Sequence, residues 1–345
     1  MHFRSVAQLN DAVVAWSRDL PRDIDLIVGI PRSGMLAATL LALHMDLRPA
    51  DLDGLLRQDV FLGGKRTRMR HGATWEHALV VDDSVLTGGS IREARHKVEA
   101  AGISGRISFG AVYTGRRTRP GELDLAHEIV PAPRVFEWNV LSHDLLPRFC
   151  MDIDGVLCRD PLEDENDDGP RYEEFLDTVA ARSVPGEQVG WLVTSRLERH
   201  RDRTEAWLAA QGVRYGELLM HPADTGAERR AAGDHAARKA EAYVRTGALL
   251  FIESEAQQAQ QIARLSGKSV YCTDTRTMLQ PPAWREWRRR LLDVPSTAPV
   301  VAADALRRAP NVPGRLRREL RDRRRLRTAA DQAPPAQEHA PGPAR

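Results

Sequence analysis

Cysteine is scarce in this sequence of 345 residues, and no apolar run is long enough to cross a membrane. The three cysteines, Cys150, Cys158 and Cys272, form an odd and sparse set for a chain of this length. Such a set argues against a disulfide framework and favours a reducing compartment. The N-terminal residues also lack the basic and then apolar pattern of a secretory signal peptide. We therefore predict a cytoplasmic protein with no membrane partner, whose cysteines are small buried apolar residues.

The net charge is small, but its distribution along the chain is uneven. Residues 276–345 carry 16 arginines, no lysine and seven acidic residues, a net charge of +9, which leaves −7 for the rest of a chain whose total is +2. The end of this stretch is rich in proline, alanine and glutamine, a composition typical of disorder. We predict a basic tail over 276–345, partly helical and partly disordered. Its arginine-rich segment, 315–327, is typical of a solvated helix, with a nucleic-acid contact as the alternative.

Short apolar runs alternate with helical patterns before this tail, which is typical of parallel α/β sheets. In the first half of the chain the patterns predict strands at 25–30, 78–82, 106–113 and 135–140, with helices at 35–45 and 91–101. A second series begins near residue 147, with strands at 148–152, 190–194, 248–253 and 269–272 and helices at 199–211 and 256–265. The fold class is therefore α/β. We predict two doubly wound parallel-sheet (Rossmann-like) domains in tandem, 1–146 and 147–275, followed by the basic tail.

Two adjacent acidic residues stand at the carboxyl end of the second predicted strand. Asp82 and Asp83 occupy the position where α/β sheets bind ligands. A turn with two glycines, 87–90, follows them and opens a helix, so backbone N–H groups and the helix dipole favour an anion there. Carboxylates accept hydrogen bonds from vicinal hydroxyls, and the whole segment therefore suits a ribose 5-phosphate. The purely local alternative is a capping box formed by Ser90 and Glu93.

This segment resembles the motif by which type I phosphoribosyltransferases bind phosphoribosyl pyrophosphate (PRPP). The resemblance implies that Asp82 and Asp83 hold the ribosyl hydroxyls. It implies that the 5-phosphate is held by the loop residues Val85, Leu86, Thr87, Gly88, Gly89 and Ser90. It also implies that the earlier turn 31–34 binds the pyrophosphate through Arg32, Ser33 and Gly34, and that the Pro31–Arg32 peptide bond is cis. Residues 1–146 would then be a transferase domain with PRPP as co-substrate, for which a homodimer is one expected assembly.

A strongly basic stretch, 61–72, lies between the two loops. In the family a mobile loop at this place closes over PRPP, and the resemblance makes Lys65, Arg66 and Arg68 candidate catalytic residues. A solvated basic hairpin is the alternative. Residues 136–138 include two aromatic side chains that are candidates for stacking on a base, although packing in the core is the more usual role of such residues.

A second pair of acids, Asp152 and Asp154, follows the strand predicted at 148–152. Two carboxylates this close in sequence can share one Mg²⁺ while one of them attacks a phosphoryl group. The segment resembles the first motif of the haloacid-dehalogenase-type (HAD) phosphohydrolases, an apolar strand followed by Asp-x-Asp-Gly. The resemblance implies that Asp152 is a nucleophile that forms an aspartyl phosphate. It implies that Asp154 is the general acid and base.

The remaining HAD motifs follow in order. Thr194 ends the strand predicted at 190–194, and the resemblance implies that it bonds to the phosphoryl group. Lys239 precedes the next strand and would offset the charge of nucleophile and phosphate, with Arg238 as its rival. The intervals between the motifs leave room only for a minimal cap.

The fourth HAD motif departs from the family pattern. Two aspartates are usual there, whereas this sequence has Glu253 and, two residues later, Glu255. A glutamate can still ligate a metal, so the resemblance assigns Mg²⁺ to Asp152, Asp154 and Glu253, with Glu255 assisting.

The sequence therefore favours a bifunctional enzyme of nucleotide or nucleoside metabolism. One half would transfer a phosphoribosyl group from PRPP to a base-like acceptor, or run the reaction in reverse. The other half would hydrolyse a phosphate monoester, and Mg²⁺ would serve both. The alternative is a regulatory protein that senses PRPP or binds RNA and has degenerate catalytic sites.

Overall fold

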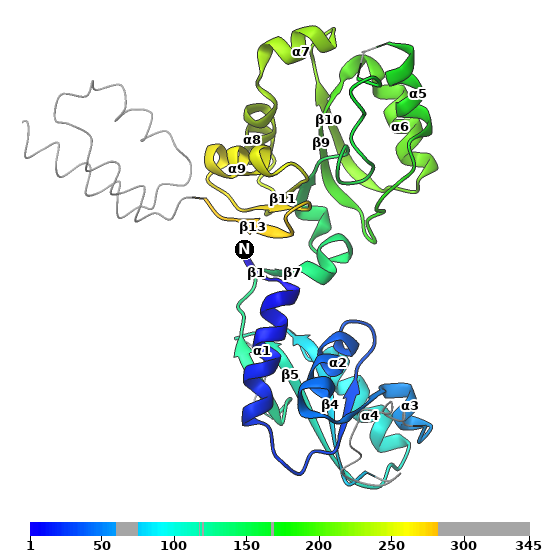
Figure 1. Cartoon of the computed structure of the whole chain (residues 1–345), viewed down its shortest axis with the longest axis vertical. Coiled ribbons are helices and arrows are strands. Elements are labelled where there is room, and N and C mark those ends of the chain that lie inside the picture. Colours follow the sequence, from blue (N-terminus) through cyan, green and yellow to red (C-terminus); the bar gives the residue numbers. More distant parts are fainter. Residues whose placement is uncertain (60–74, 117, 119–120, 167–168, 282–345) are drawn as a thin grey trace, which may run out of the picture. The chain divides into compact units, whose positions relative to one another are not determined.

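The computed structural model describes residues 1–59, 75–116, 118, 121–166 and 169–281. These residues form one compact unit that ends at Pro281, and the fold is mixed α/β (Figure 1). In the described part of the chain, no helix is both long enough and apolar enough to span a bilayer. All three cysteines are free and buried, as expected for small apolar residues. The predicted tail lies outside the described residues from 282 onward.

The first half of the chain contributes a five-stranded sheet. Its strands lie in the order β3 (Arg48–Asp51), β2 (Leu26–Gly29), β4 (His77–Val85), β5 (Arg106–Thr114) and β6 (Leu125–Ile129). All neighbouring pairs are parallel. Three of the predicted strands thus appear as β2, β4 and β5, with β4 at the centre.

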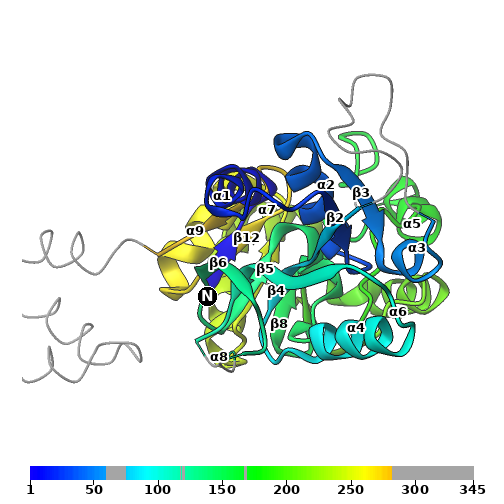
Figure 2. The ribbon, with the colours of Figure 1, turned by 90° about the horizontal axis from the view of Figure 1, so that it is seen from below.

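Helices cover both faces of this sheet (Figure 2). On one face lie α1 (Val6–Asp19) and α2 (Gly34–Met45), and on the other lie α3 (Leu52–Leu56) and α4 (Gly89–Ala100). Side chains of a strand alternate between the two faces. Leu79 accordingly packs in the cluster under α1 and α2, and Val80 packs in the cluster under α3 and α4. Burial on both faces explains why the parallel strands appear as continuous apolar runs.

The second half contributes a six-stranded sheet. Its strands lie in the order β10 (Tyr215–His221), β9 (Val189–Leu197), β8 (Phe149–Met151), β11 (Leu250–Glu253), β12 (Val270–Cys272) and β13 (Thr277–Leu279). The first five are parallel to their neighbours, and β13 is antiparallel to β12. The sheet therefore extends past residue 275, where the tail was predicted to begin.

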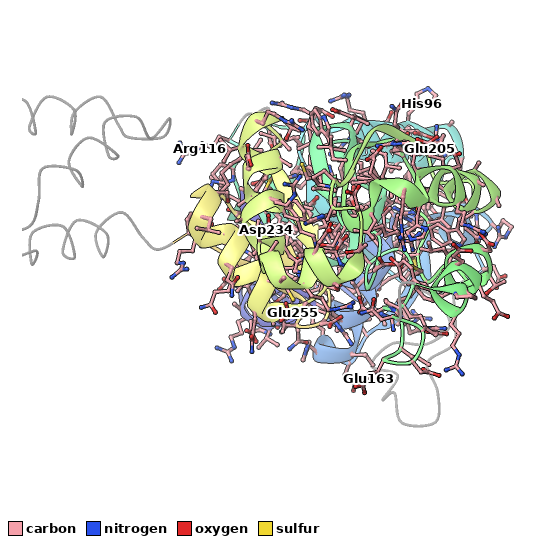
Figure 3. The ribbon with its side chains drawn as sticks, turned by 90° about the horizontal axis from the view of Figure 1, so that it is seen from above. His96, Arg116, Glu163, Glu205, Asp234 and Glu255 are labelled. Carbon is pink, nitrogen blue, oxygen red and sulfur yellow. The ribbon has the colours of Figure 1, made fainter. Side chains whose placement is uncertain are left out.

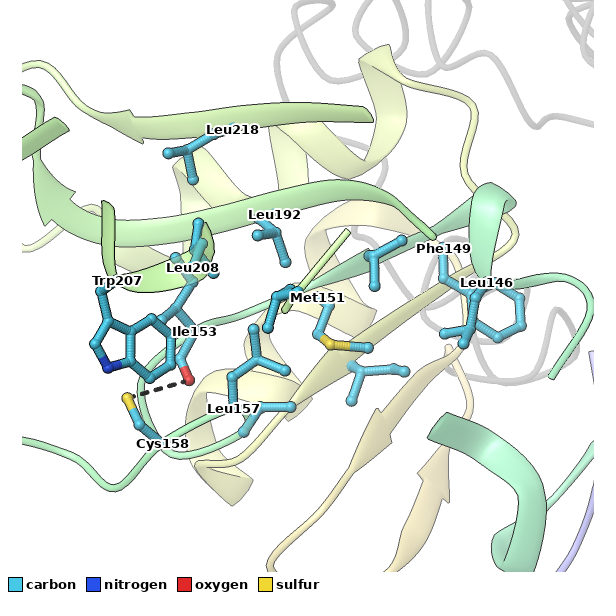
Figure 4. Packing of buried hydrophobic residues seen from close by; sticks show 14 of the residues in the cluster. Leu146, Phe149, Met151, Ile153, Leu157, Cys158, Leu192, Trp207, Leu208 and Leu218 are labelled. Atoms are coloured by element: carbon cyan, nitrogen blue, oxygen red, sulfur yellow. Dashed lines mark hydrogen bonds between the residues drawn. The ribbon is translucent and has the colours of Figure 1, made fainter. Parts of the chain in front are cut away.

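This sheet is also covered on both faces. The helices α5 (Pro170–Thr178) and α6 (Arg201–Ala210) cover one face, where Trp207 and Leu208 pack on Met151 and Leu192 (Figure 4). The helices α8 (His235–Arg245) and α9 (Ala256–Ser266) cover the other face, and a short helix, α7 (Gly226–Ala232), precedes α8. Each sheet thus has the doubly wound arrangement that was predicted. The division into domains at 146/147 stays a prediction, because residues through Pro281 form a single compact unit.

The strand predicted at 135–140 is only partly correct. A strand, β7 (Arg134–Phe136), pairs with β1 (His2–Arg4), and a 3₁₀ helix over Glu137–Ser142 replaces the remainder. The side chain of Asn139 accepts a hydrogen bond from the Phe136 N–H at 3.1 Å. Such local side-chain bonding competes with a strand ladder and turns the chain.

Candidate functional site

Asp82 and Asp83 are both buried near the carboxyl end of β4. The strand continues to Val85, so the two acids lie within it and do not follow it. The Asp83 carboxylate accepts a hydrogen bond from Ser33 Oγ at 2.7 Å and another from Trp138 Nε1 at 2.8 Å. The structure thus brings together residues of the two loops that the sequence assigned to PRPP.

The electrostatics of this acid pair are unusual. Burial raises the pKa of Asp82 to about 8, and the neighbouring charge of Asp83 acts in the same direction. A buried cation, Arg134, lies near both: burial lowers the pKa of Arg134, and the charges of Asp83 and Asp82 oppose this. A ligand that donates hydrogen bonds from hydroxyls would offset the cost of keeping both carboxylates ionised.

Asp82→Asn is expected to stabilise the protein at alkaline pH. Because the folded-state pKa of Asp82 lies above its ordinary value of 3.8, its contribution to stability is complete in acid and is lost as the pH rises through about 8. The variant lacks this loss, so its unfolding temperature should exceed that of wild type by several degrees at about pH 8.5 and differ less at about pH 5. Thermal unfolding followed by circular dichroism measures this, with the exposed Asp53→Asn as control. Parallel pH profiles of variant and wild type would contradict the assignment.

The turn 31–34 packs closely against the end of β4. A Cβ added to Gly34 would lie 2.7 Å from the Val81 carbonyl oxygen, so the turn has no room for a side chain at this position. The Pro31–Arg32 peptide bond is cis, as predicted. The guanidinium of Arg32 donates to Ser142 Oγ at 3.0 Å.

The loop 85–90 joins β4 to α4. Val85 is buried as the last residue of the strand, and Leu86 is exposed. Gly88, with φ of +74°, is the N-cap of α4, which begins at Gly89 and includes Ser90 in its first turn. Arg92 Nη1 donates to the Thr87 carbonyl at 2.9 Å and closes the turn.

The capping box of Ser90 and Glu93, which was the local alternative, is absent. The helix begins one residue before Ser90, and its N-cap is Gly88, which has no side chain. Glu93 instead pairs with Lys97 across one turn at 2.7 Å. The buried carboxylate of Glu122 pairs with Arg92 and lies where a Cβ at Gly88 would stand, so an incoming phosphate would compete with Glu122 for this end of α4.

Three aromatic rings form a stack beside the acid pair. Tyr113 and Phe136 stack with ring centroids 5.5 Å apart, and Phe136 and Trp138 with centroids 4.9 Å apart. Phe136 is buried in the core, whereas Trp138 is half-buried and bonds to Asp83. Of the two aromatic candidates, only Trp138 is partly exposed.

The candidate catalytic residues Lys65, Arg66 and Arg68 lie outside the described residues.

In the second half, Asp152 directly follows β8 and is buried. Its Oδ1 accepts the Ile153 N–H at 2.8 Å, and its Oδ2 accepts a bond from Lys239 Nζ at 2.5 Å. The same ammonium donates to Glu253 Oε2 at 2.8 Å. The structure thus joins three predicted residues, from β8, α8 and β11. The rival residue, Arg238, does not take part in this contact.

Burial raises the pKa of Asp152, and the Lys239 ammonium opposes that shift. Burial would lower the pKa of Lys239, but the charges of Asp152 and Glu253 outweigh it and raise the pKa well above its ordinary value. Lys239 is therefore a permanent cation beside the candidate nucleophile.

Asp154 is bound by a residue that the sequence analysis missed. Arg196 Nη2 donates to Asp154 Oδ1 at 2.7 Å, and Arg196 Nε donates to Oδ2 at 3.1 Å. The guanidinium is completely buried and lies over the rings of Phe175 and Trp207, at 5.9 and 5.4 Å. The signal in the sequence is weak: Arg196 follows two hydroxyl residues near the end of β9, and only its burial shows that it needs an anion as partner.

Thr194 does not end its strand, because β9 continues to Leu197. Its hydroxyl oxygen accepts the Arg196 N–H at 3.2 Å. The next residue, Ser195, lines the pocket that contains Asp152, and its Oγ lies 3.0 Å from His235 Nδ1. The position of Ser195 suits contact with a phosphoryl group in this pocket better than that of Thr194.

The three carboxylates assigned to Mg²⁺ do not form a common site. Among the described residues, no three His, Cys, Asp or Glu side chains lie close enough together to hold a metal ion. Asp152 and Glu253 share Lys239, whereas both oxygens of Asp154 accept bonds from Arg196. The prediction that Asp152, Asp154 and Glu253 together ligate Mg²⁺ does not fit this arrangement, because the two cations occupy the carboxylates.

The pocket at Asp152 has a volume of about 260 Å³. Two cations, Lys239 and Arg229, line it together with His235. Arg229 Nη1 donates to the Ser195 carbonyl at 2.9 Å, which fixes the guanidinium at the wall. Three carboxylates, Asp152, Asp154 and Asp160, also line it, so a phosphoryl group here would depend on Lys239 and Arg229 to offset their charge.

No protein-family model and no curated protein matches this chain. Solved structures with some likeness include a xanthine-guanine-hypoxanthine phosphoribosyltransferase from Helicobacter pylori, with 18% identity over 40% of this chain and 93% of that chain and a TM-score of 0.32. A purine phosphoribosyltransferase from Pyrococcus horikoshii has 18% identity over 40% of this chain and 92% of that chain, with a TM-score of 0.30. An adenine phosphoribosyltransferase from Trypanosoma brucei has 14% identity over 36% of this chain and 63% of that chain, with a TM-score of 0.24. Likeness at these TM-scores assigns neither a family nor an activity to this chain.

Proposed function

We propose that this chain is a bifunctional enzyme that transfers a phosphoribosyl group from PRPP and hydrolyses a phosphate monoester. The transferase proposal depends chiefly on one observation: a buried acid pair in β4 meets Ser33 of the turn 31–34, and α4 begins after the loop that follows this strand. Paired carboxylates, two loops and the backbone N–H groups of a helix N-terminus are the set that a ribose with phosphates at both ends requires.

In the proposed transfer, the ribosyl hydroxyls donate hydrogen bonds to Asp82 and Asp83. The 5-phosphate accepts N–H groups of the turn 87–90, and the pyrophosphate lies at the turn 31–34. Trp138, which is held against Asp83, offers a half-buried ring on which an acceptor base can stack. The C–O bond to pyrophosphate breaks while the acceptor nitrogen bonds to the same carbon.

Asp83→Asn is expected to reduce PRPP consumption at least about 100-fold, because it removes a ligand of the ribose and the charged acceptor of Ser33 and Trp138. Release of labelled pyrophosphate in the presence of a panel of purine and pyrimidine bases measures this. The exposed Asp53→Asn on α3 is the matched control and should behave as wild type. If wild type neither consumes nor binds PRPP, the transferase proposal fails. Binding without turnover would instead support the regulatory alternative.

The hydrolase proposal depends on the contact of Asp152 with Lys239. Asp152 would attack phosphorus, the P–O bond to the leaving group would break, and water would then hydrolyse the aspartyl phosphate to inorganic phosphate. Lys239 would offset the charge that gathers on the phosphoryl oxygens. Asp154 would give a proton to the leaving group and later take one from water, for which one of its oxygens must exchange its bond from Arg196 for the substrate.

A further inference from the structure

A second cavity adjoins the pocket at Asp152. Its volume is about 360 Å³, the lower end of the range for sites that bind small molecules. Residues of β9, β10 and α8 line it, and it shares Ser195, His235 and Lys239 with the first pocket. The two pockets thus lie on either side of these three residues, and a ligand with its phosphoryl group at Asp152 would pass them to enter the second cavity, which we call the α8 groove.

One face of α8 gives this groove positive charge. Arg238 and Arg245 stand seven residues apart and so lie on the same side of the helix, and both line the groove. Among the described residues neither guanidinium has a hydrogen-bond or ion-pair partner. Arg201, which also lines the groove, differs because Glu198 and Glu205 bind it. Glu241 stands three residues after Arg238 and four before Arg245, so a ligand anion would compete with this exposed carboxylate for the two arginines.

The remaining wall of the groove contains two imidazoles that already bond within the protein, since both ring nitrogens of His221 have partners and His235 Nδ1 bonds to Ser195. His221 and His235 have ring centroids 6.1 Å apart and both line the groove. His221 Nε2 lies 3.2 Å from Asp234, which precedes α8 (Figure 3). The acids of the lining are Glu198, already bound by Arg201, and Glu241, which is exposed.

The spacing along α8 limits the size of the ligand. An α-helix rises about 1.5 Å per residue, so Arg245 lies about 9 Å along the axis from Lys239, and Arg238 is adjacent to Lys239. An anion bound between the two arginines would therefore be separated from the phosphoryl group at Asp152 by a distance that a nucleoside can span. The groove therefore suits a small leaving group with its own anionic substituent.

We infer that the α8 groove binds the leaving group of the phosphomonoester hydrolysed at Asp152, and that this leaving group is nucleoside-sized and carries a second anionic group held by Arg238 and Arg245. The second group is a phosphate or a carboxylate. The inference rests on the proposed hydrolase function and specifies its substrate class.

Paired substrates test the inference and separate the two anions. Phosphate release is measured for adenosine 3′,5′-bisphosphate against adenosine 5′-monophosphate, and for a uridine 5′-monophosphate with a ring carboxylate against uridine 5′-monophosphate. Wild type should favour the member with the second anionic group in at least one pair by about 10- to 100-fold in kcat/KM. Arg245→Glu and Arg238→Glu should reduce that ratio to about one or below. Arg264→Glu, on the exposed side of α9, is the charge-matched control and should keep the ratio.

Calorimetry separates failure of the inference from failure of the proposed function. Binding of the same four compounds is measured in the Asp152→Asn background, where no turnover interferes, with and without Arg245→Glu. If the compound with the second anionic group binds more tightly and Arg245→Glu abolishes this difference, the result supports the groove. This holds even if wild type hydrolyses none of the compounds, a result that would contradict only the hydrolase proposal. Equal binding within both pairs, or a preference that survives both arginine substitutions in folded protein, overturns the groove. Near-ultraviolet circular dichroism verifies folding of each variant.

Discussion

Asp152→Asn is expected to slow phosphate release from a phosphate monoester by at least about 1,000-fold, because an amide cannot form the aspartyl phosphate. The protein should remain folded, since Lys239 retains Glu253 as a buried partner at 2.8 Å. The loss should therefore appear in kcat while the affinity for substrate stays close to that of wild type. Release of p-nitrophenol from p-nitrophenyl phosphate measures the rate.

The control for this prediction makes the same chemical change at an exposed site. Asp177→Asn on α5 removes one carboxylate from the surface and should leave the rate unchanged. Retention of more than about a tenth of the activity in Asp152→Asn would show that another group attacks phosphorus. Loss of activity together with a large fall in the unfolding temperature would indicate instead that the substitution disrupted the buried ion pair.

The interior of both sheets was predictable from the sequence, and their edges were not. The central strands β4 and β11 are buried on both faces, so their apolar runs are continuous and identify them directly. Four strands that were missed, β3, β6, β10 and β13, are the edge strands of the two sheets, where solvent reaches side chains and the apolar run is broken. The helix α1 was also missed, although Ser5 and Gln8 form a capping box that the sequence displays.

The candidate sites divide in the same way. Residues that follow a strand, such as Asp152, are found from local pattern, because a strand delivers them to one edge of a sheet. The contacts of Trp138 with Asp83 and of Arg196 with Asp154 join residues 55 and 42 positions apart in the chain. No local pattern fixes such pairs, since they depend on how the helices and loops pack. The pairing of Lys239 with Asp152 and Glu253, and of Arg196 with Asp154, could not be predicted for the same reason.

Arg196→Met is expected to lower the free energy of unfolding by about 3–5 kcal/mol, because it leaves the Asp154 carboxylate, whose side chain is only 17% exposed, without its buried cation. Urea unfolding measures the change. Adding Asp154→Asn to Arg196→Met should restore much of the loss, because the unpaired charge is then removed as well, and the double-mutant cycle isolates the coupling between the two side chains.

Arg203→Met is the matched control for this prediction. Arg203 pairs with Glu173 and Asp177 at the surface, with 41% of its side chain exposed, so its loss should cost no more than about 1 kcal/mol. If Arg196→Met costs no more than Arg203→Met, the buried pair contributes nothing specific to this fold. If the double variant is no more stable than Arg196→Met alone, the loss of stability arises from lost packing against Phe175 and Trp207. It does not then arise from the unpaired charge of Asp154.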